Sequence, residues 1–148
     1  LFNHAAYRRA FEDRLQRYVS DGQLEPDSVQ RTGPVEDGTL SALYQTADVL
    51  AFPSLREGWG LAVLEAQASG TPVVASDIAV LREYLVDGQN ALLVAPEDPP
   101  ALARALVRAV TDRALAGALR EGGLATARRF DWGSSAERHI DVYRGLIA

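Results

Sequence analysis

The chain has 148 residues, with fifteen basic against twenty acidic side chains and a formal net charge of −5. A chain of about 150 residues can bury a stable core as one domain. The absence of cysteine excludes disulfides and thiolate metal sites. The acidic balance without a basic run argues against a nucleic-acid surface, and no apolar run reaches the about 18 residues of a membrane span. Methionine is absent even at position 1, so we expect the chain to begin inside a longer reading frame.

The first third of the chain predicts a helix, a strand and a second helix. Apolar residues at helical spacing predict an amphipathic helix that covers a sheet and ends at Asp21–Gly22; they are Tyr7, Phe11, Leu15, Tyr18 and Val19. Ser28–Thr32 reads as a short strand, with a turn at Gly33–Pro34 after its carboxyl end. The next helix is short and carries Leu40, Leu43, Tyr44 and Ala47.

The central stretch predicts strand, glycine-containing loop, helix and strand. Val49–Phe52 and Val73–Ala75 are short apolar runs next to prolines, which is typical of parallel strands buried on both faces. The helix between them begins after Gly58-Trp59-Gly60 and ends at Gly70, because glycine best accepts the left-handed position after a helix.

The last third predicts helical turns at Leu81–Leu85, a strand at Ala91–Val94 and three further helices. Pro99 and Pro100 fit the first turn of one helix, whose expected inner face is Leu102, Leu106, Val107 and Val110. Another helix runs through Leu115 and Leu119, and the last spans about Ser134–Leu146, with Ala136, Ile140, Tyr143 and Ile147 on one side. Strands alternating with helices predict an α/β fold, a Rossmann-like parallel sheet flanked by helices, which binds ligands at the carboxyl ends of its strands.

The loop and helix start of the central stretch lie at that edge. Free N–H groups of Gly60, Leu61 and Ala62, together with the helix dipole, favour an anion such as a diphosphate. Glu65 is roughly 7 Å further along the helix axis. A nucleotide resting its phosphates on the helix end can therefore give its ribose hydroxyls to Glu65 and the group beyond the phosphates to Glu57.

Several structural interpretations compete with this site. A loop glutamate and a helix glutamate are ordinarily solvated, although Glu65 interrupts an apolar run and, if buried, needs a ligand or a neighbouring arginine. Gly58 and Gly60 can serve only as turn residues. A dinucleotide fingerprint is the nearest rival, with Asp77 as its ribose acid, but Val63 stands at its third glycine and the loop is too long. Asp77 can instead cap the next helix.

The stretch PSLREGWGLAVLEAQASGTPVVAS resembles the donor half of retaining GT-B glycosyltransferases, in particular those of family 4. The shared features are two glutamates with seven residues between them, a Gly-aromatic-Gly between the glutamates, and a glycine and a proline after the helix. The likeness is close over about Gln30–Val110. It implies that residues 1–148 are part of a C-terminal domain that binds a nucleoside diphosphate sugar. The acceptor domain and the first part of the donor domain would lie outside the chain.

The resemblance implies a role for each motif residue. Glu57 would bind the sugar hydroxyls and stabilise charge at the anomeric centre, with Gly58 and Trp59 beside it, and Glu65 would bind the ribose. The amides around Gly60, Leu61 and Ala62 would meet the diphosphate, and the backbone of Gly33–Val35 the base. No metal or cofactor is expected; His4 and His139 are far apart in the sequence.

The same resemblance implies what the chain lacks. The family holds the diphosphate with an arginine and a lysine from earlier in the domain, and this chain has no lysine. We therefore expect it to be inactive alone. A sugar or glycolipid acceptor, and any membrane surface, would be reached through the missing domain of a cytoplasmic enzyme; nucleic acid is not an expected partner. The alternative of another class is a non-catalytic module that binds a sugar nucleotide.

Overall fold

The structure is a computed structural model that describes residues 4–147, with the backbone alone for residues 4, 5 and 7. It divides into two units, residues 1–35 and residues 36–148. The first unit contains α1 (His4–Ser20), which ends where the sequence predicts, with Asp21 N–H donating to Arg17 O at 2.9 Å. The loop after α1 is tied back to it by an ion pair between Arg31 and Glu12.

The strand expected at Ser28–Thr32 is absent, which corrects the sequence prediction. These residues are irregular and exposed. A strand needs a neighbour to satisfy its N–H and C=O groups, and the described part of this unit contains no second strand. Phe11 and Tyr18 are each 44 % exposed. The expectation that α1 covers a sheet stays a prediction, and the side chain of Tyr7 lies outside the described residues.

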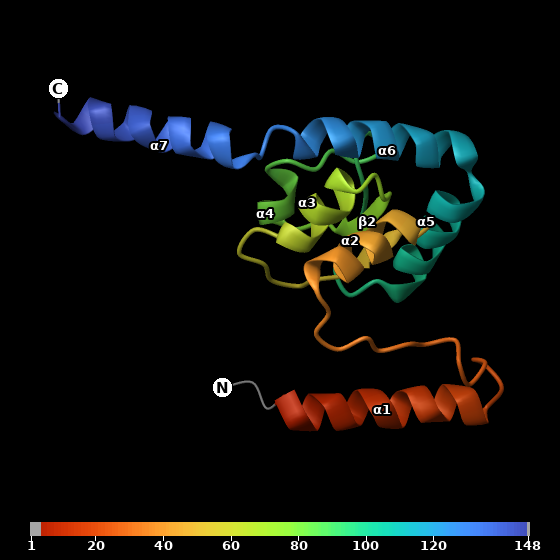
Figure 1. Cartoon of the computed structure of the whole chain (residues 1–148). Helices are drawn as coiled ribbons and strands as arrows, with labels where there is room; N and C mark the ends of the chain where they lie inside the picture. Colours follow the sequence, from red (N-terminus) through yellow and green to blue (C-terminus); the bar gives the residue numbers. More distant parts are fainter. Residues whose placement is uncertain (1–3, 148) are drawn as a thin grey trace. The chain divides into compact units, whose positions relative to one another are not determined.

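The second unit holds a parallel sheet with helices around it (Figure 1). Its elements are α2 (Asp37–Thr46), β1 (Leu50–Phe52), α3 (Leu61–Ala68), β2 (Val73–Ser76), α4 (Ala79–Arg82), β3 (Leu92–Val94), α5 (Pro99–Thr111), α6 (Arg113–Ala127) and α7 (Trp132–Ile147). The strand order is β1-β2-β3, with Leu50 opposite Val73 and Val74 opposite Leu92. All three carboxyl ends therefore meet at one edge, as in the predicted α/β fold.

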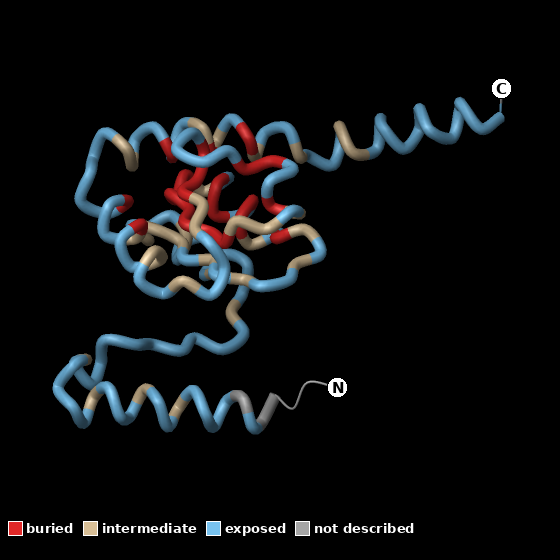
Figure 2. Tube along the Cα trace, turned by 180° about the vertical axis from the view of Figure 1, so that it is seen from behind, coloured by how far each residue is buried: buried red, intermediate tan, exposed pale blue. Residues whose placement is uncertain are grey.

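The core lies on both faces of β2, whose four residues are all buried. The buried segments gather in the interior of the second unit (Figure 2). Val73 and Ala75 point to one side, where they pack with Val63 and Leu64 of α3. Val74 points to the other side and belongs to a second cluster with Leu92, Ala105, Ala109 and Leu119. The prediction that a strand here is buried on both faces is confirmed for β2, and α3 and α5 are the helices that cover those two faces.

Two expectations about buried faces are wrong. β1 is an edge strand with Ala51 exposed, because β2 is its one neighbour among the described strands. In α5, Leu102 and Leu106 pack against the core as predicted. Val107 and Val110 are instead 60 % and 48 % exposed, and the small Ala105 and Ala109 take the buried positions. The helical turn expected at Leu81–Leu85 begins earlier and is short, as α4. In α7 no residue is buried, so its apolar side chains are exposed on the helix.

A buried polar cluster connects the loop before β3 to the helices. Asn90 is 6 % exposed. Its amide nitrogen donates to Tyr84 O at 2.8 Å and to Thr126 Oγ1 at 2.7 Å, and its Oδ1 accepts from Val86 N–H at 2.7 Å. Gln67 donates to Asn90 O at 2.8 Å, which explains why a polar residue stands on the inner face of α3. The cluster satisfies backbone groups that burial would otherwise leave without partners.

Candidate functional site

The loop after β1 delivers the start of α3 to the carboxyl edge of the sheet. Gly60 is the N-cap of α3 and has a φ of 85°, a left-handed conformation that glycine adopts at little cost. A Cβ atom at Gly60 would lie 2.8 Å from Leu81 Cδ2 and 2.9 Å from the Tyr84 hydroxyl. Gly58 has open space around it. Of the two glycines, only Gly60 is therefore required by close packing as well as by its backbone.

The first turn of α3 has backbone donors to offer. Val63 N–H donates to Gly60 O at 2.9 Å, while the N–H groups of Gly60, Leu61 and Ala62 have no acceptor among the described residues. Such donors, aligned with the positive end of the helix dipole, form an anion site. The structure therefore brings together the three amides that the sequence singles out.

Glu57 is held in the loop just before these amides. It is half-buried, and its Oε1 accepts a hydrogen bond from the Ser54 hydroxyl at 2.7 Å. The sequence-based prediction gave Ser54 no role. The signal that could have indicated this hydrogen bond is the position of Ser54 three residues before Glu57. The hydrogen bond restricts the rotamers of Glu57 and leaves its other carboxylate oxygen available to a ligand.

Glu65 differs from expectation. Its side chain is exposed, and no arginine among the described residues forms an ion pair with it. It instead accepts a hydrogen bond from the Tyr44 hydroxyl of α2 at 3.2 Å. Burial, with the charge of Glu65 and this hydrogen bond adding to it, raises the pKa of Tyr44. The Tyr44 hydroxyl therefore stays protonated and can orient Glu65 by donating to it. The sequence could not reveal this role, because the position of Tyr44 in its helix fits a core residue equally well.

Trp59 lies in an aromatic cluster, which we define as Trp59, Tyr84 and Phe130. The Trp59 ring centroid is 5.3 Å from that of Tyr84 and 5.5 Å from that of Phe130, and the last two are 5.6 Å apart. These are favourable separations for tilted and edge-to-face rings. The cluster fixes the central residue of the Gly-Trp-Gly loop to the body of the domain.

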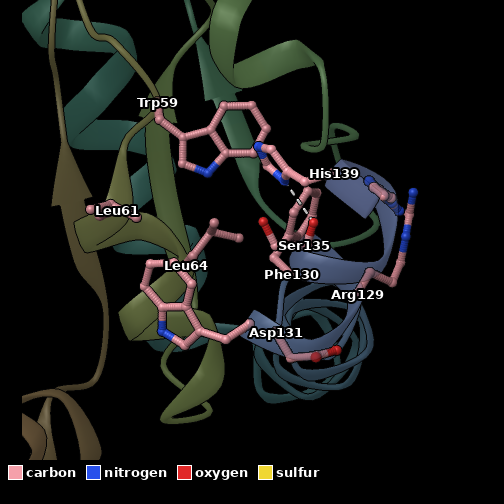
Figure 3. A pocket seen from close by; sticks show the side chains of 10 residues that line it. Trp59, Leu61, Leu64, Arg129, Phe130, Asp131, Ser135 and His139 are labelled. Atoms are coloured by element: carbon pink, nitrogen blue, oxygen red, sulfur yellow. Dashed lines mark hydrogen bonds between the residues drawn. The ribbon is translucent and has the colours of Figure 1, made fainter. Parts of the chain in front are cut away.

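A cavity of about 470 Å³ opens beside the start of α3 (Figure 3). One part of it is lined by residues of the Gly-Trp-Gly loop and α3, and the rest by residues of the segment between α6 and α7 and of the first half of α7. The lining residues are Trp59, Leu61, Leu64, Arg129, Phe130, Asp131, Trp132, Ser135, Arg138 and His139. His139 Nδ1 lies 2.7 Å from Ser135 O. No local sequence pattern indicates this cavity, because its two sides are far apart in the chain.

Asp77 follows β2 at the same edge but does not cap α4. The N-cap is Ile78, and Asp77 forms an ion pair with Arg82, with Arg82 Nη2 donating to Oδ2 at 2.5 Å. Hydrogen bonding to Arg82 lowers the pKa of Asp77. Val63, at the third position of a dinucleotide fingerprint, is fully buried in the core. An engaged Asp77 and a buried Val63 both disfavour the dinucleotide interpretation.

The other candidates take separate places. Gly33, with a φ of 64°, and Val35 lie in the first unit, so their contact with a base stays a prediction. The side chain of His4 is outside the described residues. Among the side chains that the structure describes, no three of His, Asp or Glu gather where they could hold a metal ion. Nor does this part of the chain contain a helix with the length and apolar content to span a membrane.

Comparison with known proteins places this site in a wider context. The sequence profile described as "Glycosyl transferases group 1" matches residues 6–112. A D-inositol 3-phosphate glycosyltransferase of Streptosporangium roseum is 41 % identical over 122 residues, which are 82 % of this chain and 28 % of that protein. One from Acidothermus cellulolyticus is 38 % identical over 92 % of this chain and 30 % of its own length. The chain thus spans under a third of these relatives.

Solved structures agree with the fold. Sucrose-phosphate synthase from Thermosynechococcus elongatus is 34 % identical, with a TM-score of 0.84 over 96 % of this chain and 35 % of the other. Anabaena HepE in complex with UDP-glucose is 24 % identical, with a TM-score of 0.82 over 98 % of this chain and 38 % of the other. These likenesses confirm the predicted α/β fold with a parallel sheet flanked by helices.

Proposed function

Because the chain belongs to the group 1 glycosyl transferases, we propose that it forms much of the donor site of a retaining glycosyltransferase of family 4. The enzyme would transfer a sugar from a nucleoside diphosphate sugar to an acceptor hydroxyl. The observation that carries the proposal is the start of α3, where unpartnered N–H groups lie between two glutamates that are each oriented by a hydroxyl. HepE, a protein of the same fold, has been solved with UDP-glucose.

In this proposal the diphosphate accepts hydrogen bonds from the amides of Gly60, Leu61 and Ala62. The helix dipole stabilises the negative charge that grows on the diphosphate as the bond to the sugar breaks. Glu57, fixed by Ser54, accepts hydrogen bonds from the sugar hydroxyls. Its charge lies where positive charge develops at the anomeric carbon, with the backbone of Gly58 and the Trp59 ring beside the sugar. Glu65, oriented by Tyr44, binds the ribose hydroxyls.

The proposal also implies partners outside the chain. The amino-terminal end of a helix supplies roughly half a positive charge, which is too little to balance the negative charge of a diphosphate. Further cations are therefore required. The arginine and lysine pair that the resemblance implies cannot be complete here, because all fifteen basic residues of the chain are arginine. We propose that residues 1–148 are part of the C-terminal domain, that the cations and the acceptor site are elsewhere in a cytoplasmic enzyme, and that no metal takes part. The sugar or glycolipid acceptor would be bound by the other domain, and the base would meet Gly33–Val35.

The test uses the full-length protein and a panel of UDP-, GDP- and ADP-sugars. Glu57→Gln is expected to lower transfer by about a hundredfold or more, the scale of losing one transition-state contact, while nucleoside diphosphate still binds. Glu65→Ala is expected to weaken nucleoside diphosphate binding about tenfold in calorimetry.

Glu121→Gln, an exposed α6 residue outside the site, is the control. Wild-type turnover in Glu57→Gln would remove the catalytic role of Glu57, and wild-type affinity in Glu65→Ala would remove the ribose role. A wild-type protein that binds a sugar nucleotide but transfers no sugar would be a non-catalytic binding module. The anomeric configuration of the product, read by NMR, tests retention.

A further inference from the structure

A buried tyrosine packs against the Gly-Trp-Gly loop and has no role in the proposed function so far. Tyr84 follows α4 and is 4 % exposed. Its hydroxyl lies 2.9 Å from Trp59 O and 3.3 Å from Gly60 O, so it donates to the carbonyls of two successive peptide groups. We propose that Tyr84 is a positioning residue whose hydroxyl aims the amides at the start of α3 toward the diphosphate; this rests on the proposed function.

The geometry of the peptide group carries the argument. In a planar trans peptide the C=O and the following N–H point in opposite directions. The group that ends in Trp59 O carries the N–H of Gly60, and the group that ends in Gly60 O carries the N–H of Leu61. A donor that holds both carbonyls from the core side therefore points both N–H groups away from the core, where an anion can accept them.

Packing holds the Tyr84 hydroxyl in one position. The Tyr84 ring is fixed by Trp59 and Phe130 in the aromatic cluster, and the Gly60 backbone approaches so closely that a Cβ there would lie 2.9 Å from the hydroxyl. Burial, with the charge of Glu57 adding to it, raises the pKa of Tyr84 to about 12, so the hydroxyl keeps its proton. Loss of the hydroxyl would leave Trp59 O without its donor, whereas Gly60 O would keep the hydrogen bond from Val63 N–H at 2.9 Å. The peptide group that carries the N–H of Gly60 would then be free to rotate, and that of Leu61 would lose one of its two constraints.

The experiment compares Tyr84→Phe with wild type in the full-length protein. Affinities are measured by NMR titration for the nucleoside diphosphate that the donor panel identifies and for the same nucleoside without phosphates. Tyr143→Phe is the matched control, because Tyr143 is 60 % exposed and lies in α7 outside this loop. We expect Tyr84→Phe to weaken diphosphate binding about tenfold, the scale of one buried hydrogen bond, and to leave nucleoside binding and Tyr143→Phe at wild-type values.

Two results would overturn the proposal. Unchanged diphosphate affinity in Tyr84→Phe would show that the amides are aimed without the hydroxyl, and an equal loss for nucleoside and diphosphate would show general loosening of the domain. Glu65→Ala separates this failure from that of the proposed function. If Glu65→Ala weakens binding while Tyr84→Phe does not, the donor site stands and only the role of Tyr84 falls.

Discussion

The two glycines that flank Trp59 should respond very differently to alanine. At Gly60 an alanine must take a left-handed conformation, which costs about 1–2 kcal/mol. Its Cβ would also lie 2.8 Å from Leu81 Cδ2 and 2.9 Å from the Tyr84 hydroxyl, and such overpacking costs roughly 1–3 kcal/mol. We expect Gly60→Ala to lower the free energy of unfolding by about 2–5 kcal/mol, the sum of these two costs.

Two further variants separate strain from crowding. Gly88 has a φ of 71°, and a Cβ atom there would meet no other atom within 4 Å, so Gly88→Ala should show the backbone cost alone. Gly58 has open space and no positive φ, so Gly58→Ala should stay within about 0.5 kcal/mol of wild type. Urea unfolding followed by circular dichroism measures all three. A Gly60→Ala protein no less stable than Gly88→Ala would refute the crowding argument.

Two other predictions concern stability. Asn90→Ala should lower the free energy of unfolding in urea by about 2–4 kcal/mol, because Val86 N–H and Tyr84 O lose their partners. Gln45→Ala, at an exposed position, is the control. An equally small effect of both variants would show that the hydrogen bonds of Asn90 do not stabilise the domain. Arg82→Ala should destabilise the domain at neutral pH, because Arg82 lowers the pKa of Asp77 below 3.8. The difference in free energy of unfolding between Arg82→Ala and wild type should shrink as the pH falls below 3.8 and Asp77 becomes protonated. A stability difference between Arg82→Ala and wild type that is the same at neutral pH and below pH 3.8 would exclude the ion pair with Asp77 as its source.

Local signals in the sequence were sufficient for the centre of the fold. Gly60 and Gly70 mark the ends of α3, because each adopts a positive φ that other residues rarely take. The apolar run at Val73 predicted the central strand, because a strand covered on both faces has no polar alternation. The amides of Leu61 and Ala62 followed from the helix start alone, since the first N–H groups of any helix lack partners.

Expectations failed where the answer depends on distant segments. Whether Val107 or Ala105 faces the sheet depends on how closely α5 approaches, and small residues allow the closer approach. The exposure of Glu65 and its bond to Tyr44 require α2 and α3 to meet, which periodicity within either helix does not specify. Tyr84 and Phe130 reach Trp59 from positions far along the chain, so no motif around Trp59 could indicate them.

The aromatic cluster also makes the Gly-Trp-Gly loop visible to fluorescence. The chain has two tryptophans, and the second, Trp132, is 91 % exposed, whereas Trp59 is half-buried against Tyr84 and Phe130. With Trp132 replaced by phenylalanine, the indole emission of these residues comes from the middle of the Gly-Trp-Gly loop alone. Its wavelength and its quenching by iodide then report how tightly that loop is held against the domain.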